Sequence, residues 1–311
     1  MKSELLLRPQ PLFHEKIWGG ERMRSPYGYD IPSAHTGECW AISAHKNGDC
    51  PMLGEYRGET LGSLWKTRRG LFGGLEGENF PLLIKIIDAK EDLSVQVHPD
   101  DAYAAAHENG SLGKTECWYI LDCDPGATII IGHNCATRDE LREKVEQGRW
   151  SELLREVPVK KGDFFQIDPG CVHAIKGGTM ILETQQSSDV TYRFYDYGRL
   201  ENGRPRPLHI EQSLAVATVP FVPRAPERES RRDGDALITR LVKCSYYSVY
   251  RVELGGRASL EWDEPFVNMS VISGEGEIDG LKVRAGTHLV VPAGYGALDL
   301  SGNMELICSH V

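Results

Sequence analysis

Short runs of β-branched and aromatic residues alternate along the chain with glycine, proline and polar residues. Apolar runs of this length, bounded by turn residues, predict β-strands, and many closely spaced strands are typical of a β-sandwich or barrel. In the first two thirds of the chain the clearest predicted strands are Pro81–Asp88, Leu93–His98, Glu116–Leu121, Ala127–Ile131 and Met180–Thr184. The pattern therefore predicts a mainly β fold.

Two segments depart from this rhythm. Within Thr137–Arg155 the apolar residues recur at roughly helical spacing, and Thr137 with Glu140 three residues later is the pattern of a capping box. We expect Gly148 to divide this insertion into two short helices. A further short helix is predicted at Glu59–Lys66.

A change of composition divides the chain into two parts. Residues 220–235 are rich in Pro, Arg, Glu and Asp, which indicates a linker or a long surface loop. We therefore expect an N-terminal β domain at 1–219, with a helical insertion at about 137–155, and a small C-terminal β domain at 236–311. In the second domain we expect strands at Ser245–Leu254, Phe266–Ser273 and Thr287–Val291, and a turn at Gly274–Gly280.

Charge and composition narrow the class of protein. The formal net charge is −10, and an acidic chain is a poor general binder of nucleic acid or of anionic membranes. No apolar run approaches the roughly 18–20 residues of a membrane span, and the N-terminal apolar run is too short for a signal peptide. The eight cysteines form no C-x-x-C pair, which favours reduced thiols. We expect a cytoplasmic protein, and a monomer because its two domains bury surface against each other.

The main candidate for chemistry is the segment LSVQVHPDD. Residues two apart in a strand share one face, so Ser94, Gln96 and His98 are expected to project together. Glu116 follows in another predicted strand, and His173 follows a turn. Two imidazoles, a carboxylate and an amide oxygen would form an open, mixed nitrogen and oxygen site that suits zinc, iron or manganese. The alternative is that these are separate, hydrogen-bonded structural residues.

Several motifs carry a resemblance to a known family over nearly the whole chain. They are KIWGG at Lys16–Gly20, TGECWAIS at Thr36–Ser43, LLIKIIDAKEDLSVQVHPDDAYA at Leu82–Ala104, GKTECWYIL at Gly113–Leu121, PGCVHAI at Pro169–Ile175 and ETQQSSDVTYRFYDYGR at Glu183–Arg199. With these motifs the chain resembles the type I phosphomannose isomerases, in their short bacterial form. QVHPDD and YRFYDYGR are highly specific in combination.

The resemblance implies two cupin-type jelly-roll β-barrels, with one Zn²⁺ per chain in the N-terminal barrel and a metal-free C-terminal barrel. By motif position the zinc ligands are His98, Glu116 and His173, and Gln96 occupies a fourth ligand position. The implied reaction interconverts mannose 6-phosphate and fructose 6-phosphate through an enediolate. Arg193 matches the arginine that the family uses in catalysis, where a guanidinium would stabilise the enediolate. The alternative for Arg193 is a structural ion pair with Asp196 or Asp189.

The phosphate of such a substrate requires cations. Lys85 lies within an otherwise apolar strand, so it either lines a cavity or is paired with Asp88 or Asp92. Lys114 matches a family active-site lysine, which would bind phosphate or assist proton transfer, and Ser94 is a further candidate for phosphate binding.

The sequence does not decide which group is the general base. This group must lie near C1 and C2 of the sugar and have a pKa close to neutral pH. The candidates are Glu183, Asp189, Lys114 and a zinc-bound water.

Three other functions remain open from the sequence. One is a different metal-dependent cupin enzyme such as an iron dioxygenase, because one fold serves many reactions. Another is an isomerase of a different aldose. The third is a non-catalytic protein that binds a sugar phosphate. The lysine and arginine residues favour a small sugar phosphate over oxygen as the substrate.

Overall fold

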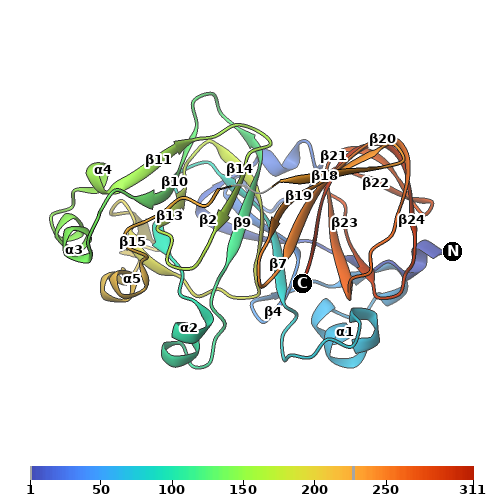
Figure 1. Cartoon of the computed structure of the whole chain (residues 1–311), viewed down its shortest axis with the longest axis horizontal. Coiled ribbons are helices and arrows are strands. Elements are labelled where there is room, and N and C mark those ends of the chain that lie inside the picture. The colour runs from blue at the N-terminus through green and yellow to red at the C-terminus, as the bar shows by residue number, and fades with distance from the viewer. Residues whose placement is uncertain (1, 226–227) are drawn as a thin grey trace.

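The computed structural model describes residues 2–225 and 228–311, and it is mostly β. Two β units lie side by side, with helices at the outer edges (Figure 1). None of the helices in the described part of the chain has the length and apolar character that a membrane crossing requires. All eight cysteines are free thiols, as expected from their spacing.

The N-terminal unit contains two antiparallel sheets. The larger sheet has the spatial order β12 (Phe164–Ile167), β9 (Glu116–Cys123), β14 (Thr179–Gln186), β7 (Leu82–Ala89), β2 (Leu12–Gly20) and β3 (Thr36–Ile42). The smaller sheet has the order β11 (Leu154–Pro158), β10 (Thr128–His133), β13 (His173–Ile175), β8 (Val95–Val97) and β15 (Tyr192–Tyr195). Strands β7 and β14 at the centre of the sheet are buried along their whole length. The nearly continuous apolar sequence of β7 fits this position, whereas β14 (TMILETQQ) also buries several polar residues.

The C-terminal unit is one seven-stranded antiparallel sheet that curls in Figure 1. Its order is β18 (Glu229–Asp233), β19 (Ala236–Lys243), β20 (Ser248–Leu260), β24 (Leu298–His310), β21 (Phe266–Ile278) and β22 (Leu281–Arg284), and β23 (His288–Pro292) also pairs with β21. Strand β21 continues through Gly274–Ile278, where a turn was expected. A Cβ at Gly274 or Gly276 would clash with the backbone of β24. These glycines therefore allow close packing of the two strands and do not form a turn.

In the described part of the chain, five α-helices lie outside the sheets. They are α1 (Leu61–Thr67), α2 (Asp101–His107), α3 (Arg138–Glu146), α4 (Trp150–Leu153) and α5 (Ile210–Val216). Thr137 is the N-cap of α3, and its side chain accepts a hydrogen bond from the amide of Glu140. Gly148, with φ +65°, separates α3 from α4, so the predicted division of the insertion is confirmed. The insertion ends earlier than expected, because Leu154 already begins strand β11.

Short elements complete the connections. Three two-stranded pairs are β1 (Arg8–Pro9) with β6 (Met52–Leu53), β4 (Ala44–His45) with β5 (Gly48–Asp49), and β16 (Leu200–Glu201) with β17 (Arg204–Pro205). The 3₁₀ turns of residues 2–225 and 228–311 are η1 (Lys2–Leu5), η2 (Arg22–Arg24), η3 (Gly54–Tyr56) and η4 (Arg69–Phe72).

The expected linker at 220–235 is only partly irregular. Its last part forms the edge strand β18, which pairs with β19 from Glu229 to Asp233. Charged residues are common on such exposed edges, which explains why composition alone suggested a loop. Residues 226–227 of the expected linker lie outside the described residues.

One hydrophobic core joins the two units. It combines Trp65 and Ile84 of the first unit with Tyr247, Phe266 and Ile307 of the second. The first residues of the chain also belong spatially to the second unit, because Leu6 packs in its inner core and the Leu7 amide bonds to the Val290 carbonyl (3.0 Å). The boundary between the units therefore does not follow the order of the sequence.

Candidate active site and metal centre

Three strands bring the predicted metal ligands together between the two sheets. Gln96 lies in β8, His173 begins the neighbouring strand β13, and these two residues are register partners. His98 follows one residue after the end of β8, and Glu116 begins β9 in the opposite sheet. The side chains of His98, Glu116 and His173 are all buried.

The donor atoms of these three residues lie within 4.8 Å of one another. Glu116 Oε2 is 3.4 Å from His98 Nε2, and Glu116 Oε1 is 3.4 Å from His173 Nε2. Ligand bonds of about 2.0–2.2 Å to a tetrahedral zinc place the ligand atoms about 3.3–3.6 Å apart. The amide nitrogen of Gln96 is 3.3 Å from His173 Nε2, so the side-chain amide of Gln96 borders the same centre.

Backbone carbonyls hold both imidazoles in one orientation. The Nδ1–H of His98 donates to the Val190 carbonyl (2.9 Å), and the Nδ1–H of His173 donates to the Cys171 carbonyl (2.9 Å). The Nε2 lone pairs therefore face Glu116, which is the arrangement that metal-binding histidines require. Burial, and then the nearby Lys114, lower the pKa of His98 to about 3, so this imidazole is neutral. Burial also lowers the pKa of His173.

Glu116 is the carboxylate of the cluster. Among the described residues no hydrogen-bond donor satisfies its Oε1, although this oxygen is buried. Its Oε2 is 2.6 Å from the ammonium of Lys114. Burial opposes ionisation of Glu116, but the ammonium of Lys114 lowers its pKa well below the usual value. A buried, ionised and incompletely satisfied carboxylate between two neutral imidazoles fits a divalent metal ion.

A polar cavity of about 450 Å³ opens beside this cluster. Seven of the residues considered for the site line it: Lys85, Ser94, Gln96, Lys114, Glu183, Asp189 and Arg193. The buried side chains of Trp18 and Trp40 also contribute to its wall. The cavity therefore has a size suited to a small molecule and a lining of charged and aromatic groups.

The larger sheet presents a row of paired groups to the cavity. Glu183 of β14 is the register partner of Lys85 in β7, and their charged groups are 3.6 Å apart. The indole N–H of Trp118 donates to Glu183 Oε2 (3.0 Å). Burial, and then Glu116, raise the pKa of Glu183. Lys85 thus lines the cavity and is also paired, but with Glu183 and Glu38 instead of with the aspartates expected from the sequence.

The smaller sheet presents Arg193 to the same cavity. Arg193 is the register partner of Gln96, its Nε donates to Ser94 Oγ (3.1 Å), and its Nη1 donates to the Pro207 carbonyl (3.0 Å). No ion pair of Arg193 with an aspartate occurs among the described contacts. The structural ion pair considered from the sequence is therefore not formed, and the guanidinium faces the cavity.

Other cavity residues were missed by the analysis of the sequence. Glu38 lies between Lys16 (3.4 Å) and Lys85 (4.0 Å). Burial opposes its ionisation, but Lys85 and then Lys16 lower its pKa to about 2. The motif TGECW contains Glu38 and could have indicated it. Arg206 also lines the cavity, and no local pattern marks it, because it follows a turn far from the ligands in sequence.

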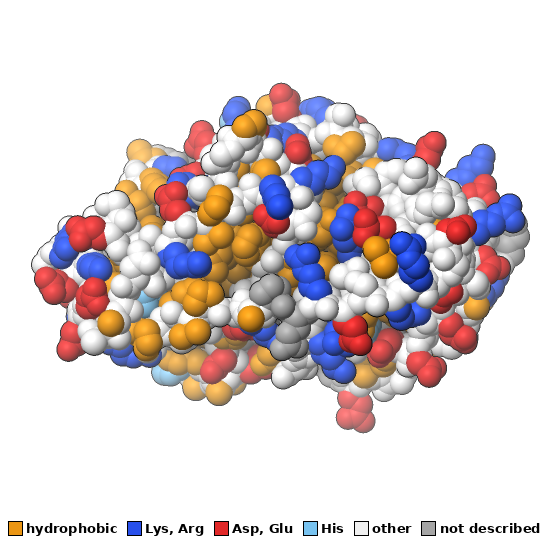
Figure 2. All heavy atoms as spheres, turned by 45° about the horizontal axis from the view of Figure 1, so that its top comes forward, with side chains coloured by type: hydrophobic (Ala, Val, Ile, Leu, Met, Phe, Trp, Pro, Cys, Tyr) orange, Lys and Arg blue, Asp and Glu red, His pale blue; other side chains and the backbone are white. Residues whose placement is uncertain are grey.

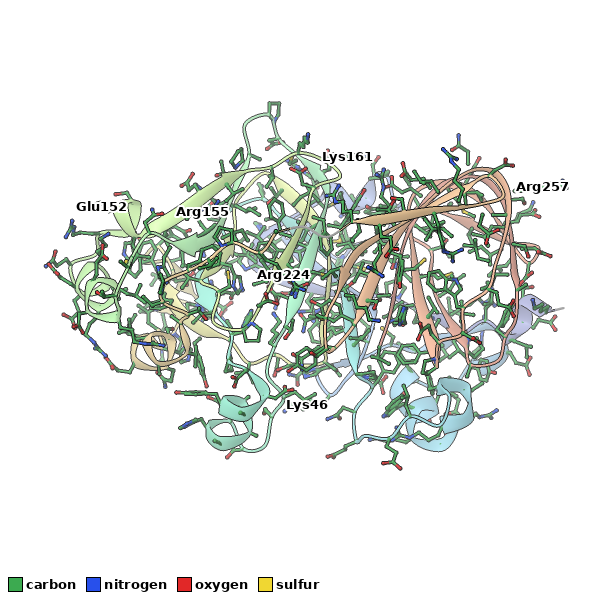
Figure 3. All side chains as sticks on the ribbon, viewed as in Figure 1. Lys46, Glu152, Arg155, Lys161, Arg224 and Arg257 are labelled. Carbon is green, nitrogen blue, oxygen red and sulfur yellow. The ribbon has the colours of Figure 1, made fainter. Side chains whose placement is uncertain are left out.

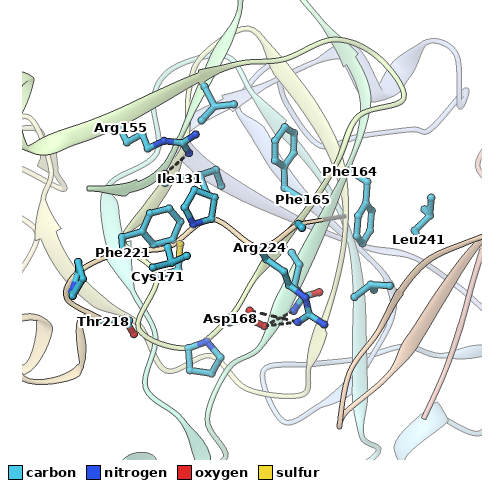
Figure 4. A pocket seen from close by; sticks show the side chains of 18 of the residues that line it. Ile131, Arg155, Phe164, Phe165, Asp168, Cys171, Thr218, Phe221, Arg224 and Leu241 are labelled. Atoms are coloured by element: carbon cyan, nitrogen blue, oxygen red, sulfur yellow. Dashed lines mark hydrogen bonds and ion pairs between the residues drawn. The ribbon is translucent and has the colours of Figure 1, made fainter. Parts of the chain in front are cut away.

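A second cavity of about 400 Å³ lies between the two units and shares no lining residue with the first. Its walls are mainly apolar, with Phe165, Phe221 and Leu241 around it (Figure 4). Figure 2 shows hydrophobic side chains gathered on one face with Lys and Arg side chains on both sides. The arginines of this cavity, Arg155 and Arg224, are labelled in Figure 3. It contains none of the predicted catalytic groups.

Comparisons with known proteins show which family the chain is similar to. The family described as phosphomannose isomerase type I, catalytic domain, matches residues 6–121, and the mannose-6-phosphate isomerase cupin domain matches residues 237–311. The mannose-6-phosphate isomerase ManA of Bacillus subtilis is 51% identical, over 97% of this chain and 98% of that protein. The mannose-6-phosphate isomerase of Streptococcus mutans is 47% identical, over 100% and 99% of the two chains.

Solved structures give the same result. A crystal structure of mannose 6-phosphate isomerase from Bacillus subtilis superposes with a TM-score of 0.97 at 45% identity, covering 98% of this chain and 99% of that one. A zinc-bound mannose 6-phosphate isomerase shares the fold, with a TM-score of 0.80 at 15% identity over 98% and 99% of the chains. The chain therefore belongs to the type I phosphomannose isomerase family.

Proposed function

We propose that the protein is a zinc-dependent aldose–ketose isomerase that interconverts D-mannose 6-phosphate and D-fructose 6-phosphate. The observation that carries this proposal is the buried cluster of His98, Glu116 and His173 beside a polar cavity of sugar-phosphate size. The names of its relatives, which are mannose-6-phosphate isomerases, support the same substrate. The proposal includes a cytoplasmic monomer whose partner is the small sugar phosphate, with no nucleic-acid partner.

His98, Glu116 and His173 would hold one zinc ion per chain, with Gln96 as the fourth protein ligand. Bound zinc supplies Lewis-acid polarisation of the sugar oxygens. The protein contributes neutral imidazoles, because carbonyl bonds at Nδ1 direct both Nε2 atoms towards Glu116.

Glu183 moves the carbon-bound proton between C1 and C2 in this proposal. Burial shifts the pKa of Glu183 upwards from that of an exposed glutamate, in the direction of neutral pH, as a general base requires. Its bond from Trp118 and its pairing with Lys85 hold the carboxylate towards the cavity. The exposed Asp189 is the weaker candidate, since its side chain is bound by Asn47 (2.7 Å) at the rim.

Two cations assist at the oxygen atoms. Lys114 faces the cavity from the end of the metal cluster, so its ammonium can exchange a proton with O1 or O2. Arg193 carries a fixed positive charge beside Gln96 and stabilises the negative charge of the enediolate. Lys85 and Ser94 complete the polar wall as candidate phosphate-binding groups.

The test is conversion of mannose 6-phosphate to fructose 6-phosphate by the purified protein, before and after chelation and after addition of zinc. We expect activity that is lost with the metal and restored by zinc. Activity that is indifferent to chelation would exclude a metal-assisted mechanism. A zinc-loaded protein without activity on this substrate would exclude the proposed reaction.

A further inference from the structure

The second cavity, of about 400 Å³, lies where the two sheets of the first unit end. Strand β11 is at one edge of the smaller sheet and β12 is at one edge of the larger sheet, and residues of both strands line this cavity. Residues of the segment 218–225 and of β19 in the second unit complete its wall. Its volume lies in the range of small-molecule sites, which is about 300–1,000 Å³.

Three phenylalanine rings give the cavity an apolar wall (Figure 4). Phe164 and Phe165 come from β12, and Phe221 comes from the segment that follows α5. All three side chains pack against hydrophobic cores, yet each is only partly buried. Aromatic rings form favourable offset and edge-to-face contacts with other rings. The wall therefore favours a ligand with an aromatic body.

Hydrogen bonds behind the cavity hold part of its wall in place. Gly170 precedes the lining residue Cys171, and its amide donates to the His98 carbonyl (2.9 Å). The Gly170 carbonyl accepts from the amide of Thr218 (2.9 Å), which is another lining residue. The Cys171 carbonyl accepts from the ring of His173 (2.9 Å). A ligand therefore does not have to order these residues when it binds.

The charged groups around the cavity are mainly positive. Among the described residues its lining contains three cations, Arg155, Arg224 and Lys243, and one carboxylate, Asp168. Asp168 pairs with Arg224 (3.3 Å), so Arg155 and Lys243 are left without a carboxylate partner among the described ion pairs. This excess of positive charge lies on a chain whose formal net charge is −10. Charge complementarity therefore favours an anionic ligand.

Arg155 has free donors for the anionic group of such a ligand. It shares the cavity face of β11 with Val157, because residues two apart in a strand point to the same side. Its Nη1 donates to the Ile131 carbonyl (3.2 Å), and the neighbouring carboxylate of Glu156 binds Lys176 instead (2.8 Å). Among the described contacts, Nε and Nη2 of Arg155 have no acceptor. This edge of a guanidinium can bind a carboxylate through two parallel hydrogen bonds.

We propose that the second cavity binds a small aromatic carboxylate, with its ring among the three phenylalanines and its carboxylate at Arg155. The ring of Phe221 packs directly on Gly132, and Arg155 binds the carbonyl of the preceding residue, Ile131. One ligand can therefore contact both the ring and the guanidinium. Such a ligand is neither substrate nor product of the proposed isomerisation, so this inference does not depend on the proposed function.

The experiment compares a charged and an uncharged ligand of the same shape. 2-Naphthoate and 2-naphthamide are titrated into the zinc-loaded protein, and binding is followed by ligand-observed NMR. We expect a Kd for 2-naphthoate on the order of 1 mM or lower, as for ligands of this size, and binding of 2-naphthamide about tenfold weaker. Arg155→Met should weaken 2-naphthoate about tenfold, the lower end for a charged hydrogen bond, and should change the Kd of 2-naphthamide less than about twofold.

Other variants locate the site. Arg138→Met is the matched control, because Arg138 also donates to a backbone carbonyl, that of Leu214 (2.6 Å), but lies outside the cavity lining. It should leave the affinity for both ligands unchanged. Val157→Trp fills the cavity from β11 and should abolish binding of both ligands. Melting temperatures show which variants fold, and Val222→Trp, at an exposed lining residue, replaces Val157→Trp if that variant does not fold.

Four results would overturn the proposal. The first is no binding of 2-naphthoate, and the second is equal affinity of the wild type for the two ligands. The third is an equal effect of Arg155→Met and Arg138→Met on 2-naphthoate. The fourth is displacement of 2-naphthoate by mannose 6-phosphate or inorganic phosphate together with full binding to folded Val157→Trp, which would place the ligand in the cavity beside the metal cluster.

Discussion

The ammonium of Lys114 lies 2.6 Å from Glu116 Oε2 and 3.3 Å from His98 Nε2, and all three groups are buried. Burial disfavours the charged ammonium, but Glu116 and Glu183 outweigh burial and raise the pKa of Lys114. One carboxylate thus serves both a fixed cation and the candidate metal centre.

This sharing predicts opposite effects of Lys114→Met on metal binding and on catalysis. Removal of a positive charge beside Glu116 should increase the affinity for zinc, because two cations no longer compete for one carboxylate. The loss of the proton donor should reduce kcat about 10²- to 10⁴-fold. Competition with a zinc-binding dye and steady-state kinetics measure the two effects separately. A variant that loses both zinc affinity and activity would show that Lys114 supports the metal site.

Substitution of a candidate metal ligand should remove the metal without unfolding the chain. We expect His173→Gln to lower zinc content by elemental analysis and to abolish activity, because the cluster loses one of its two imidazoles. His133→Gln is the matched control, since His133 is also a buried histidine bonded to a backbone carbonyl (3.0 Å) but lies outside the cluster. Equal zinc content in both variants would contradict the ligand role of His173.

Glu183→Gln should affect the chemical step more than binding. It preserves the shape of the side chain and removes the base, so kcat should fall about 10²- to 10⁴-fold with little change in KM. Asp189→Asn is the comparison, because Asp189 lies at the rim of the same cavity with a half-exposed side chain. If Asp189→Asn reduces kcat more than Glu183→Gln does, the base is Asp189.

His288 makes the stability of the protein depend on pH. Tyr29 donates its single hydroxyl proton to the Gly286 carbonyl (2.8 Å), so its oxygen accepts from His288 Nε2 (2.7 Å), and Ser270 Oγ can donate to Nδ1 of the neutral ring (2.8 Å). Burial lowers the pKa of His288 to about 3, below the value of about 6.5 in the unfolded chain. Between pH 3 and pH 6.5 the unfolded state therefore binds more protons than the folded state. The stability that is present above pH 6.5 is lost as the pH falls towards 3.

Urea melts across this range test the prediction. The wild type should lose up to about 1.4 kcal/mol per pH unit more than His288→Gln below pH 6.5. Above pH 6.5 the difference between the two proteins should be constant. The exposed His107→Gln serves as the control and should follow the wild type. A constant difference between wild type and His288→Gln at all pH values would contradict the prediction.

Gly170 connects the fold to the metal centre. It has φ +83°, its amide bonds to the His98 carbonyl (2.9 Å), and a Cβ there would lie 2.3 Å from Thr218 Oγ1. Gly170→Ala should therefore lower the free energy of unfolding by more than 1 kcal/mol, about the cost of the backbone conformation alone, and weaken zinc binding. Gly126→Ala is matched, because Gly126 has φ +79° with open space around it. Equal losses in both would show that the contact with Thr218 contributes nothing.

The sequence predicted the parts of this protein that local pattern controls. Strands such as β7 and β9, and the cap of α3 at Thr137, follow from apolar runs and from one side-chain bond. Strand β18 was taken for a linker, because pairing with β19 instead of its own composition decides its structure. The extension of β21 through Gly274 depends in the same way on its neighbour β24.

In the candidate site, too, local sequence predicted some residues, whereas the positions of others depend on strand pairing. Alternation in β8 placed Ser94, Gln96 and His98 on one face, and family motifs indicated Glu116, His173 and Arg193. The partners of Lys85 could not be predicted, because Glu38 and Glu183 come from neighbouring strands whose register only the fold sets. Arg206 was missed for the same reason, since its place depends on Asp196 holding it from across a turn.

The hydrophobic core shared by the two β units has a consequence for how the enzyme moves and melts. Side chains such as Trp65 and Phe266 pack in the same core from opposite units, so a hinge motion of one unit against the other would have to open this core. The cavity beside the metal cluster is lined only by residues of the first unit, so a ligand can bind there without movement of one unit against the other. Heating should accordingly give a single calorimetric peak, in which the unit with the metal cluster and the unit without it lose their structure together.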